Sequence, residues 1–325
     1  MELRRLVRGS VEWSRLESIA HELAERYGGE TAHVTFLDAD NWLSTPFVLD
    51  VGDATYFVKV ITRQNSLVHA LFTTGRNLGA FTSGTEGFFE HFGTPYQMAE
   101  HELDATRRMR DIGLNAPEPV EALEMDGLGV LVLEYLPAFR PLDELDVERE
   151  RELAPELFRA LHTMHEHGLA HGDLRAENVL ILDGDLYFID ATNVRGAVGD
   201  EGETGDGGGE SDDGGTGGTG GGGTAERAGS ADPADAVPAE PTGAGEAGED
   251  ARRYDLACGL AALEPLIGAA DAVEAALSAY PFADLLGARE YLDFVRVRPD
   301  HDFDGPALKG EIEKRADADE AGEAT

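Results

Sequence analysis

The segment HGLAHGDLRAENVLILDGDLYFID, residues 167–190, spaces acidic and amide side chains in a way that suits chemistry on phosphate groups. Asp173 follows His171 by two residues, and Asn178 lies five residues further on. Asp190 comes after an apolar hairpin. Phosphoryl transfer needs metal ions on the phosphates and a carboxylate beside the attacking hydroxyl. Asp173 suits the carboxylate task, and Asn178 and Asp190 suit Mg²⁺ as hard oxygen ligands. The competing interpretation is a polar loop whose acids only face water.

A lysine within an apolar strand is the second candidate. The chain has three lysines, and Lys59 lies between Val58 and Val60 in the alternating segment TYFVKVI. We expect Lys59 to hold phosphate groups as a flexible point charge. The alternative is an edge lysine that protects a strand against aggregation.

The helix that follows this strand offers a carboxylate partner for Lys59. Its candidates are Glu100, Glu102 and Asp104. Counting back along the helix from the turn at residues 112–114 selects Glu102. The other two carboxylates are then expected to face solvent.

These side chains require a small sheet and a set of helices to hold them in place. Alternating apolar residues and Asp-Gly turns predict strands within 31–60 and hairpins over 121–136 and 179–190. Apolar spacing and terminal glycines predict helices over 1–27, 99–113, 151–168 and 252–268, with one or two more before about residue 295. Residues 62–97 have no clear period and are interpreted as an insert or mobile loop. The pattern as a whole predicts an α+β fold.

Two segments are predicted to lie outside the packed core. Residues 197–250 consist mainly of glycine, acids, alanine, threonine and proline. Such a segment buries too little apolar surface to offset its ordering entropy, so we expect it to be disordered. It contains no Gly-Lys-Ser/Thr and is therefore not a Walker phosphate loop. The acidic end, from about residue 310, is expected to fray.

The formal net charge of −38 is extreme. Adaptation to high salt explains it best, because the acids are spread along the chain, and the alternative is an acidic protein that binds a basic partner. The charge argues against a basic nucleic-acid-binding face. No run of about 18 apolar residues predicts a membrane span, and the first residues lack the apolar centre of a signal peptide. With Cys258 as the single cysteine, we expect a reducing, cytoplasmic setting.

Several motifs together carry a resemblance to a known family. They are YFVKVI, EHELDATRRMRDIGLNAPEPV, LVLEYL, HGDLRAENVLI, YFIDAT and ARRYDLACGLAAL. The chain resembles the atypical RIO-type and Bud32-like branch of the protein-kinase-like superfamily, over about residues 30–195 and 250–270. The catalytic-loop spacing is the most specific part of the match. In composition the chain resembles proteins of halophilic archaea.

The resemblance implies a two-lobed protein-kinase-like fold that uses ATP and Mg²⁺. By position, Lys59 would contact phosphates and pair with Glu102, and the backbone from Glu134 to Leu136 would bind adenine. Asp173 would be the catalytic base, with Asn178 and Asp190 as metal ligands. The expected divisions are a helical segment at 1–28, a β-rich lobe at 29–136, a helical lobe at 137–196 and 250–305, a disordered insert at 197–249 and an acidic tail at 310–325.

Three features depart from the family pattern. Gly172 replaces the usual arginine after the catalytic-loop histidine, and Asp190 is followed by Ala-Thr instead of Phe-Gly. The loop that normally covers the phosphates reads LDADNWLSTPF and has no glycine. There Ser44 and Thr45 would offer hydroxyl and backbone donors, and the alternative is an ordinary turn.

Three functions are compatible with these residues. The favoured one is a RIO-like serine/threonine kinase or ATPase that acts on an unidentified acceptor, with protein hydroxyls preferred. The second is a small-molecule phosphotransferase of the aminoglycoside or choline type. The third is a nucleotide-binding pseudokinase scaffold, which the missing glycines favour. A ribosome-associated role follows from the family resemblance alone.

Overall fold

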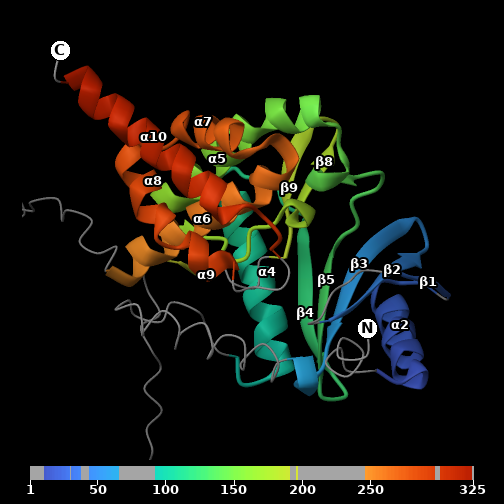
Figure 1. The fold of residues 1–325 in the computed structure, drawn as a ribbon. Helices are drawn as coiled ribbons and strands as arrows, with labels where there is room; N and C mark the ends of the chain where they lie inside the picture. Colours follow the sequence, from blue (N-terminus) through green and yellow to red (C-terminus); the bar gives the residue numbers. More distant parts are fainter. Residues whose placement is uncertain are drawn as a thin grey trace, which may run out of the picture. The chain divides into compact units, whose positions relative to one another are not determined.

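A computed structural model describes residues 11–29, 31–37, 44–65, 92–190, 195–196, 246–296 and 301–323. All of them belong to one compact unit. Within it, a β-rich part precedes a helical part along the chain (Figure 1). The α+β, two-lobed architecture expected from the sequence is confirmed. Residues 197–249 were expected to be disordered, and 197–245 of them lie outside the described residues. Residues 62–97 were expected to form an insert, and 66–91 of them also lie outside the described residues.

The β-rich part is a five-stranded antiparallel sheet in the order β1-β2-β3-β5-β4. Its strands are β1 (Ala32–Phe36), β2 (Thr45–Val51), β3 (Ala54–Ile61), β4 (Pro119–Met125) and β5 (Leu128–Glu134). The β4–β5 hairpin turns at Asp126 and Gly127, both with positive φ. Asp-Gly suits this turn because both of its central residues must adopt left-handed backbone angles.

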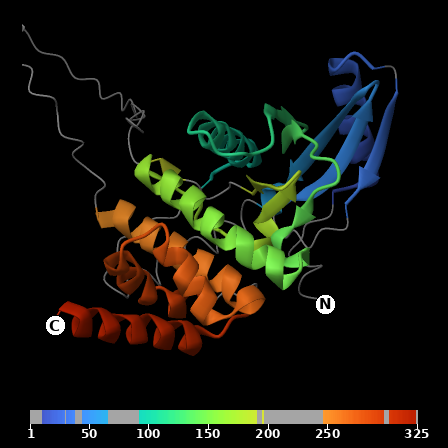
Figure 2. The same cartoon turned by 90° about the horizontal axis from the view of Figure 1, so that it is seen from above.

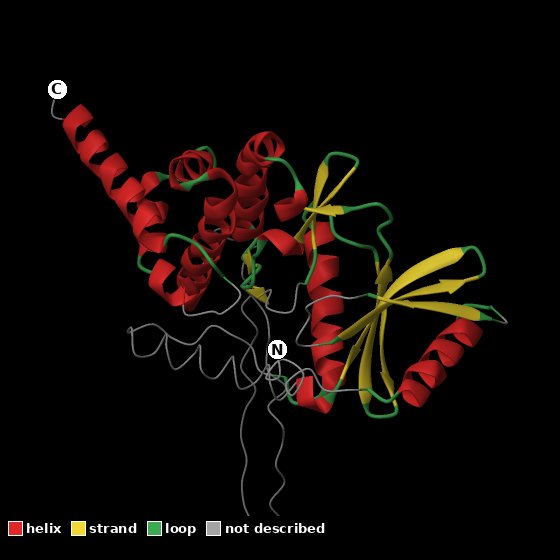
Figure 3. Ribbon diagram, turned by 45° about the vertical axis from the view of Figure 1, so that its right-hand side comes forward, coloured by secondary structure: helices red, strands yellow, loops and turns green. Residues whose placement is uncertain are grey.

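Two helices cover opposite faces of this sheet, as Figure 3 shows. Helix α2 (Trp13–Arg26) buries Leu16, Ile19 and Leu23 against one face, formed in part by Val58 and Val60. Helix α4 (Pro95–Asp111) packs on the other face, in an apolar cluster that comprises Met98, Ala99, Leu103, Ile61, Leu131 and Leu133. Because side chains alternate along a strand, Lys59 must lie on the α4 face.

Helix α4 begins four residues earlier than its apolar pattern predicts. Thr94 accepts a hydrogen bond from the Gln97 amide, and Gln97 bonds back to the Thr94 amide, which forms a capping box. Pro95 occupies the first turn, where its missing N–H costs nothing. These local bonds extend the helix beyond its apolar face.

The start of α4 lies so close to β5 that only glycine fits at position 129. A Cβ on Gly129 would lie 2.1 Å from the carbonyl oxygen of Pro95. We expect Gly129→Ala to lower the free energy of unfolding by about 1–3 kcal/mol or more, because the helix must shift to relieve the overlap. Gly310→Ala is the matched control, since nothing lies within 4 Å of its added Cβ. Urea denaturation measures both, and equal stability of the two variants would contradict the close approach.

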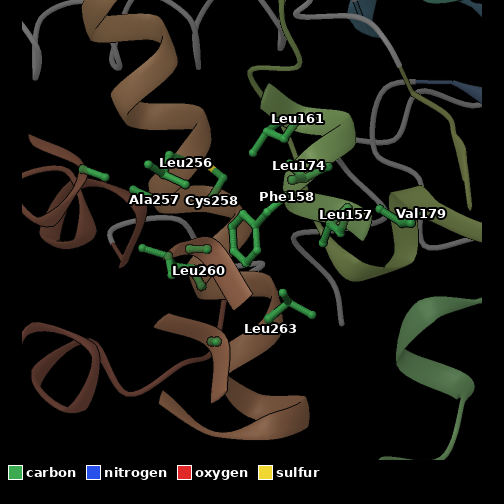
Figure 4. Packing of buried hydrophobic residues seen from close by; sticks show 14 of the residues in the cluster. Leu157, Phe158, Leu161, Leu174, Val179, Leu256, Ala257, Cys258, Leu260 and Leu263 are labelled. Carbon is green, nitrogen blue, oxygen red and sulfur yellow. The ribbon is translucent and has the colours of Figure 1, made fainter. Parts of the chain in front are cut away.

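The helical part surrounds a second core. It contains α5 (Val147–Glu166), α6 (Glu246–Ile267), α7 (Ala269–Leu277), α8 (Phe282–Arg289), α9 (Leu292–Arg296) and α10 (Gly305–Glu323), which Figure 2 shows from above. Phe158 of α5 packs among Leu260 and Leu263 of α6 (Figure 4). Gly259 permits this contact, since an added Cβ would lie 3.1 Å from the Phe158 ring. The α5–α6 pair thus forms a rigid base for the loops beside it.

Short strands carry the loops of the helical part. Strands β6 (Arg140–Pro141), β8 (Val179–Leu182) and β9 (Asp185–Phe188) form one small sheet, and β7 (Leu169–Ala170) pairs with β10 (Arg195–Gly196). Two short 3-10 helices, Leu142–Glu144 and Ala176–Asn178, complete the elements. The β8–β9 hairpin confirms the prediction for residues 179–190.

The C-terminal region differs from the sequence-based expectation. Residues 310–323 of the segment expected to form a frayed acidic tail lie in α10, whose Leu308 and Ile312 are fully buried. Arg315 of α10 also pairs with Glu274 of α7. These contacts hold a helix that its composition alone does not predict. Helix α6 begins at Glu246, inside the segment expected to be disordered, and three short helices follow it where one or two were expected.

None of the helices within the described residues combines the length and the apolar character that crossing a bilayer requires.

Candidate phosphoryl-transfer site

Lys59 lies at the centre of the candidate site. It is 5 % exposed and points from β3 toward α4. Its Nζ lies 2.5 Å from Oε1 of Glu102 and 2.9 Å from Oδ1 of Asp190. Of the three carboxylates that the sequence offers, Glu102 is therefore the one that meets Lys59. Glu100 bonds to Tyr96 and Asp104 to Arg107 at the surface.

The three charges alter one another's ionisation. Burial by itself lowers the pKa of Lys59, but the charges of Asp190 and Glu102 outweigh burial and raise it. Burial raises the pKa of Glu102, and the attraction to Lys59 offsets this only in part. Burial also opposes ionisation of Asp190, yet Lys59 and Arg175 together lower its pKa. Asp190 therefore stays ionised at more acidic pH than an ordinary aspartate.

Removing the lysine charge should destabilise the fold, because the buried carboxylate of Glu102 and the partly buried carboxylate of Asp190 would be left near one another. We expect Lys59→Met to lower the free energy of unfolding by about 3 kcal/mol. Adding Glu102→Gln should restore part of that loss by removing one of the like charges. Chemical denaturation measures both variants. Lys309→Met, which breaks the Lys309–Asp293 pair nearer the surface, should cost at most about 1 kcal/mol. An equal cost at both lysines would contradict the argument.

The loop that carries Asp173 is fixed from α6. Oδ2 of Asp255 accepts the His171 amide at 2.7 Å, and Oδ1 accepts the Gly172 amide at 2.8 Å. Nε2 of His165 lies 3.1 Å from the same carboxylate. Asp255 is completely buried, so these donors replace the water that it loses.

Gly172 has a structural reason to differ from the arginine expected at its position. Its φ is 73°, a left-handed backbone angle that costs residues with a Cβ about 1–2 kcal/mol. Its amide can then donate to Asp255. Any larger residue would strain the backbone immediately before Asp173.

Backbone and amide bonds hold Asp173, Asn178 and Asp190 in one constellation. Nδ2 of Asn178 donates to the Asp173 carbonyl at 3.0 Å. The Ile189 amide donates to the Asn178 carbonyl at 3.0 Å, and Nε2 of His171 donates to the Ile189 carbonyl at 3.1 Å. Asp190 follows with a φ of 62°, an uncommon angle that aspartate tolerates better than most residues.

The donor atoms of this constellation suit a hard divalent cation. Because Nδ2 of Asn178 is committed to a carbonyl, its Oδ1 is left as the ligand atom, and Asp190 adds carboxylate oxygens. The described residues contain no group of three or more His, Cys, Asp or Glu that would enclose a metal by themselves. Two protein ligands fit Mg²⁺, which usually takes its remaining ligands from water and substrate phosphates.

The other nucleotide-binding candidates lie at the sheet. Ser44 is buried directly before β2, and its Oγ has no hydrogen-bond partner among the described residues. Thr45 pairs with Val60 of β3. Residues 38–43, the rest of the expected phosphate loop, lie outside the described part. Glu134 ends β5, where its amide donates to the Glu118 carbonyl, and Leu136 is buried just beyond it.

Comparisons with known proteins support this arrangement. Residues 93–194 match the model of the RIO domain family. This part of the chain is therefore similar to the RIO domain. It is also 33 % identical over 93 residues to the KEOPS complex subunit Bud32 of Pyrococcus abyssi (strain GE5 / Orsay). That match covers 27 % of this chain and 41 % of Bud32, so the chain spans less than half the length of that relative.

Two solved structures share a weak similarity with this chain. The kinase PK-1 of Cydia pomonella granulovirus is 14 % identical, with a TM-score of 0.35 over 57 % of this chain and 58 % of PK-1. WaaP in complex with acyl carrier protein is 16 % identical, with a TM-score of 0.42 over 97 % and 95 % of the two chains. Both scores are too low to relate the structures in detail. The fold is therefore described from the chain's own topology.

The RIO match includes Glu102, Asp173, Asn178 and Asp190 but ends before α6. The segment ARRYDLACGLAAL predicted a family-like helix where α6 lies, but no motif singled out Asp255. The available signal was an aspartate within the apolar segment RRYDLACGL, where a charge needs a partner. Arg175 was also missed, although it lies two residues after Asp173.

Proposed function

We propose that this chain is an ATP- and Mg²⁺-dependent phosphotransferase of the RIO type, a serine/threonine protein kinase or an ATPase. The observation that carries the proposal is the 2.9 Å contact between Nζ of Lys59 and Oδ1 of Asp190. It joins the β-rich part to the loop of the helical part, at the place where the phosphates of ATP would lie. The RIO-domain match supports the same reaction class.

Each side chain has a task in this mechanism. Asp173 accepts the proton of the attacking hydroxyl as oxygen bonds to the γ-phosphorus and the bond to ADP breaks. Lys59, oriented by Glu102, neutralises phosphate oxygens. Asn178 and Asp190 would hold Mg²⁺, which when bound neutralises charge on the phosphates.

ATP turnover in molar KCl, with and without EDTA, tests the proposal. We expect the intact chain with Mg²⁺ to release inorganic phosphate or to label itself or an added protein, and EDTA to abolish both. Binding of ATP without any turnover would favour the pseudokinase scaffold instead. Absence of ATP binding would remove the proposal altogether.

A small-molecule phosphotransferase is the second candidate, and one observation favours it. Ordered helices continue after the site from α6 to α10, which is more helical structure than the sequence predicted. Helices in this region are what a pocket for a small acceptor would need. The two candidates differ in product: labelled phosphate should migrate with protein for a kinase and with a free alcohol for a small-molecule enzyme.

The remaining expectations concern setting and partners. We propose a cytoplasmic protein adapted to high salt, given the net charge of −38. The same charge disfavours a nucleic-acid partner bound through a basic face. A protein hydroxyl is the preferred acceptor, and a ribosome-associated role has only family-level support.

A further inference from the structure

Arg175 lies between the two carboxylates that the proposed reaction uses. Its Nε lies 4.0 Å from Oδ2 of Asp173, and its Nη2 lies 3.9 Å from Oδ2 of Asp190. The side chain is 19 % exposed, so solvent screens these charges only in part. Arg175 thus places a permanent positive charge beside the proposed metal ligand.

Both oxygens of the Asp190 carboxylate face a cation. Lys59 contacts Oδ1, and Arg175 approaches Oδ2. A divalent ion that uses Asp190 must take one of these oxygens and then lie close to a cationic side chain. Lys59 is held in the core by Glu102, so Arg175 is the cation that can yield.

A second carboxylate offers Arg175 another partner. Nη1 of Arg175 contacts Oε1 of Glu177, two residues further along the chain. The Glu177 side chain is 53 % exposed and belongs to the 3-10 helix Ala176–Asn178. It can therefore hold the guanidinium away from Asp190 without moving any buried element.

We propose that Arg175 is an exchangeable cation that sets the metal affinity of this site. Without metal it neutralises Asp190 and Asp173, and when a divalent ion binds Asp190 it turns fully toward Glu177. This inference rests on the proposed function, since it assumes that Asp190 binds a metal. It makes Arg175 a determinant of how much divalent ion the reaction requires.

The positive charge of Arg175 sets the direction and the rough size of its effect on metal binding. A unit charge about 4 Å away is worth about 1 kcal/mol even in bulk water and more in a partly buried site. Arg175→Gln should therefore tighten metal binding about fivefold or more. Arg175→Lys retains the charge and should bind metal nearly as the unchanged protein does.

Mn²⁺ binding to the full-length, nucleotide-free protein is the direct measurement, with free Mn²⁺ followed by electron paramagnetic resonance. Arg151→Gln is the matched control, because it removes the same charge from an exposed pair with Asp271 on the helical part. Thermal melting of each variant establishes that it is folded. ADP binding without metal, measured in parallel, reports any direct contact of Arg175 with phosphates.

A double-mutant cycle tests the exchange itself. Glu177→Gln should weaken Mn²⁺ binding in the unchanged protein, because Arg175 loses its alternative partner. The same change should have a smaller effect when Arg175→Gln is already present. Fully additive effects would show that Glu177 acts only as a distant charge and would overturn the exchange.

The outcomes separate this inference from the proposed function. Tighter Mn²⁺ binding by Arg175→Gln but not by Arg151→Gln supports the inference. Equal Mn²⁺ affinity in Arg175→Gln and the unchanged protein, with metal-free ADP binding weakened, overturns it and makes Arg175 a phosphate contact. The proposed function survives that result. No Mn²⁺ binding by any variant, with or without ADP, would overturn both.

Discussion

Replacing Asp173 with asparagine is expected to reduce phosphoryl transfer by about two to four orders of magnitude, which is the usual contribution of a general base. Asparagine has nearly the same shape but cannot accept the proton of the attacking hydroxyl. The Asp173 carbonyl that binds Asn178 is unchanged, and neither Lys59 nor Glu102 depends on the Asp173 side chain. The loss should therefore fall on turnover, while the affinity for Mg²⁺-ATP changes little.

Single-turnover assays with labelled ATP, together with calorimetric ATP binding, separate these two effects. Asp104→Asn is the matched control. Asp104 lies on α4, the helix that carries Glu102, but its side chain pairs with Arg107 at the surface. It should leave both turnover and binding unchanged. Turnover that survives Asp173→Asn would remove Asp173 as the base, whereas lost ATP binding would show that it organises the nucleotide site instead.

The local parts of this site were predictable from the sequence because they follow periodic rules. Strand alternation places Lys59 on one face of β3, and helical spacing places Glu102 opposite it. Asn178 and Asp190 flank the β8–β9 hairpin, whose Asp-Gly turn is visible in the sequence. The carry-over of these roles from the family remains a prediction that turnover and binding assays must test.

The long-range parts were not predictable by the same rules. Asp255 lies 83 residues after Gly172, and no periodic pattern links an aspartate in α6 to the amides of His171 and Gly172. Helix α10 was missed for a related reason. Its sequence is acidic and has few apolar residues, so its order depends on Leu308 and Ile312 finding the other helices. Tertiary contact decides both cases, and composition alone cannot supply it.

Asp255→Ala is expected to cost more stability than either Lys59→Met or Gly129→Ala, on the order of 5 kcal/mol. Three hydrogen bonds to a charged acceptor would be lost, each worth about 1.5–3 kcal/mol. The amides of His171 and Gly172 and the ring of His165 would be left buried without this acceptor. Asp255→Asn should cost less, because asparagine keeps one of the two acceptor oxygens. It still destabilises the protein, because its NH₂ group would face a backbone amide that also donates.

Chemical denaturation in molar KCl measures both variants against Asp271→Asn, a surface carboxylate paired with Arg151. We expect the control to change stability by less than about 1 kcal/mol. Asp255→Asn also separates the effect on stability from the effect on turnover. In the fraction that stays folded, the loop that carries Asp173 should be held less firmly. That fraction should show lower turnover with nearly unchanged affinity for ATP. If it turns over ATP normally, Asp255 stabilises the fold without positioning Asp173, and the precise placement of the base must come from Asn178 and Ile189 alone.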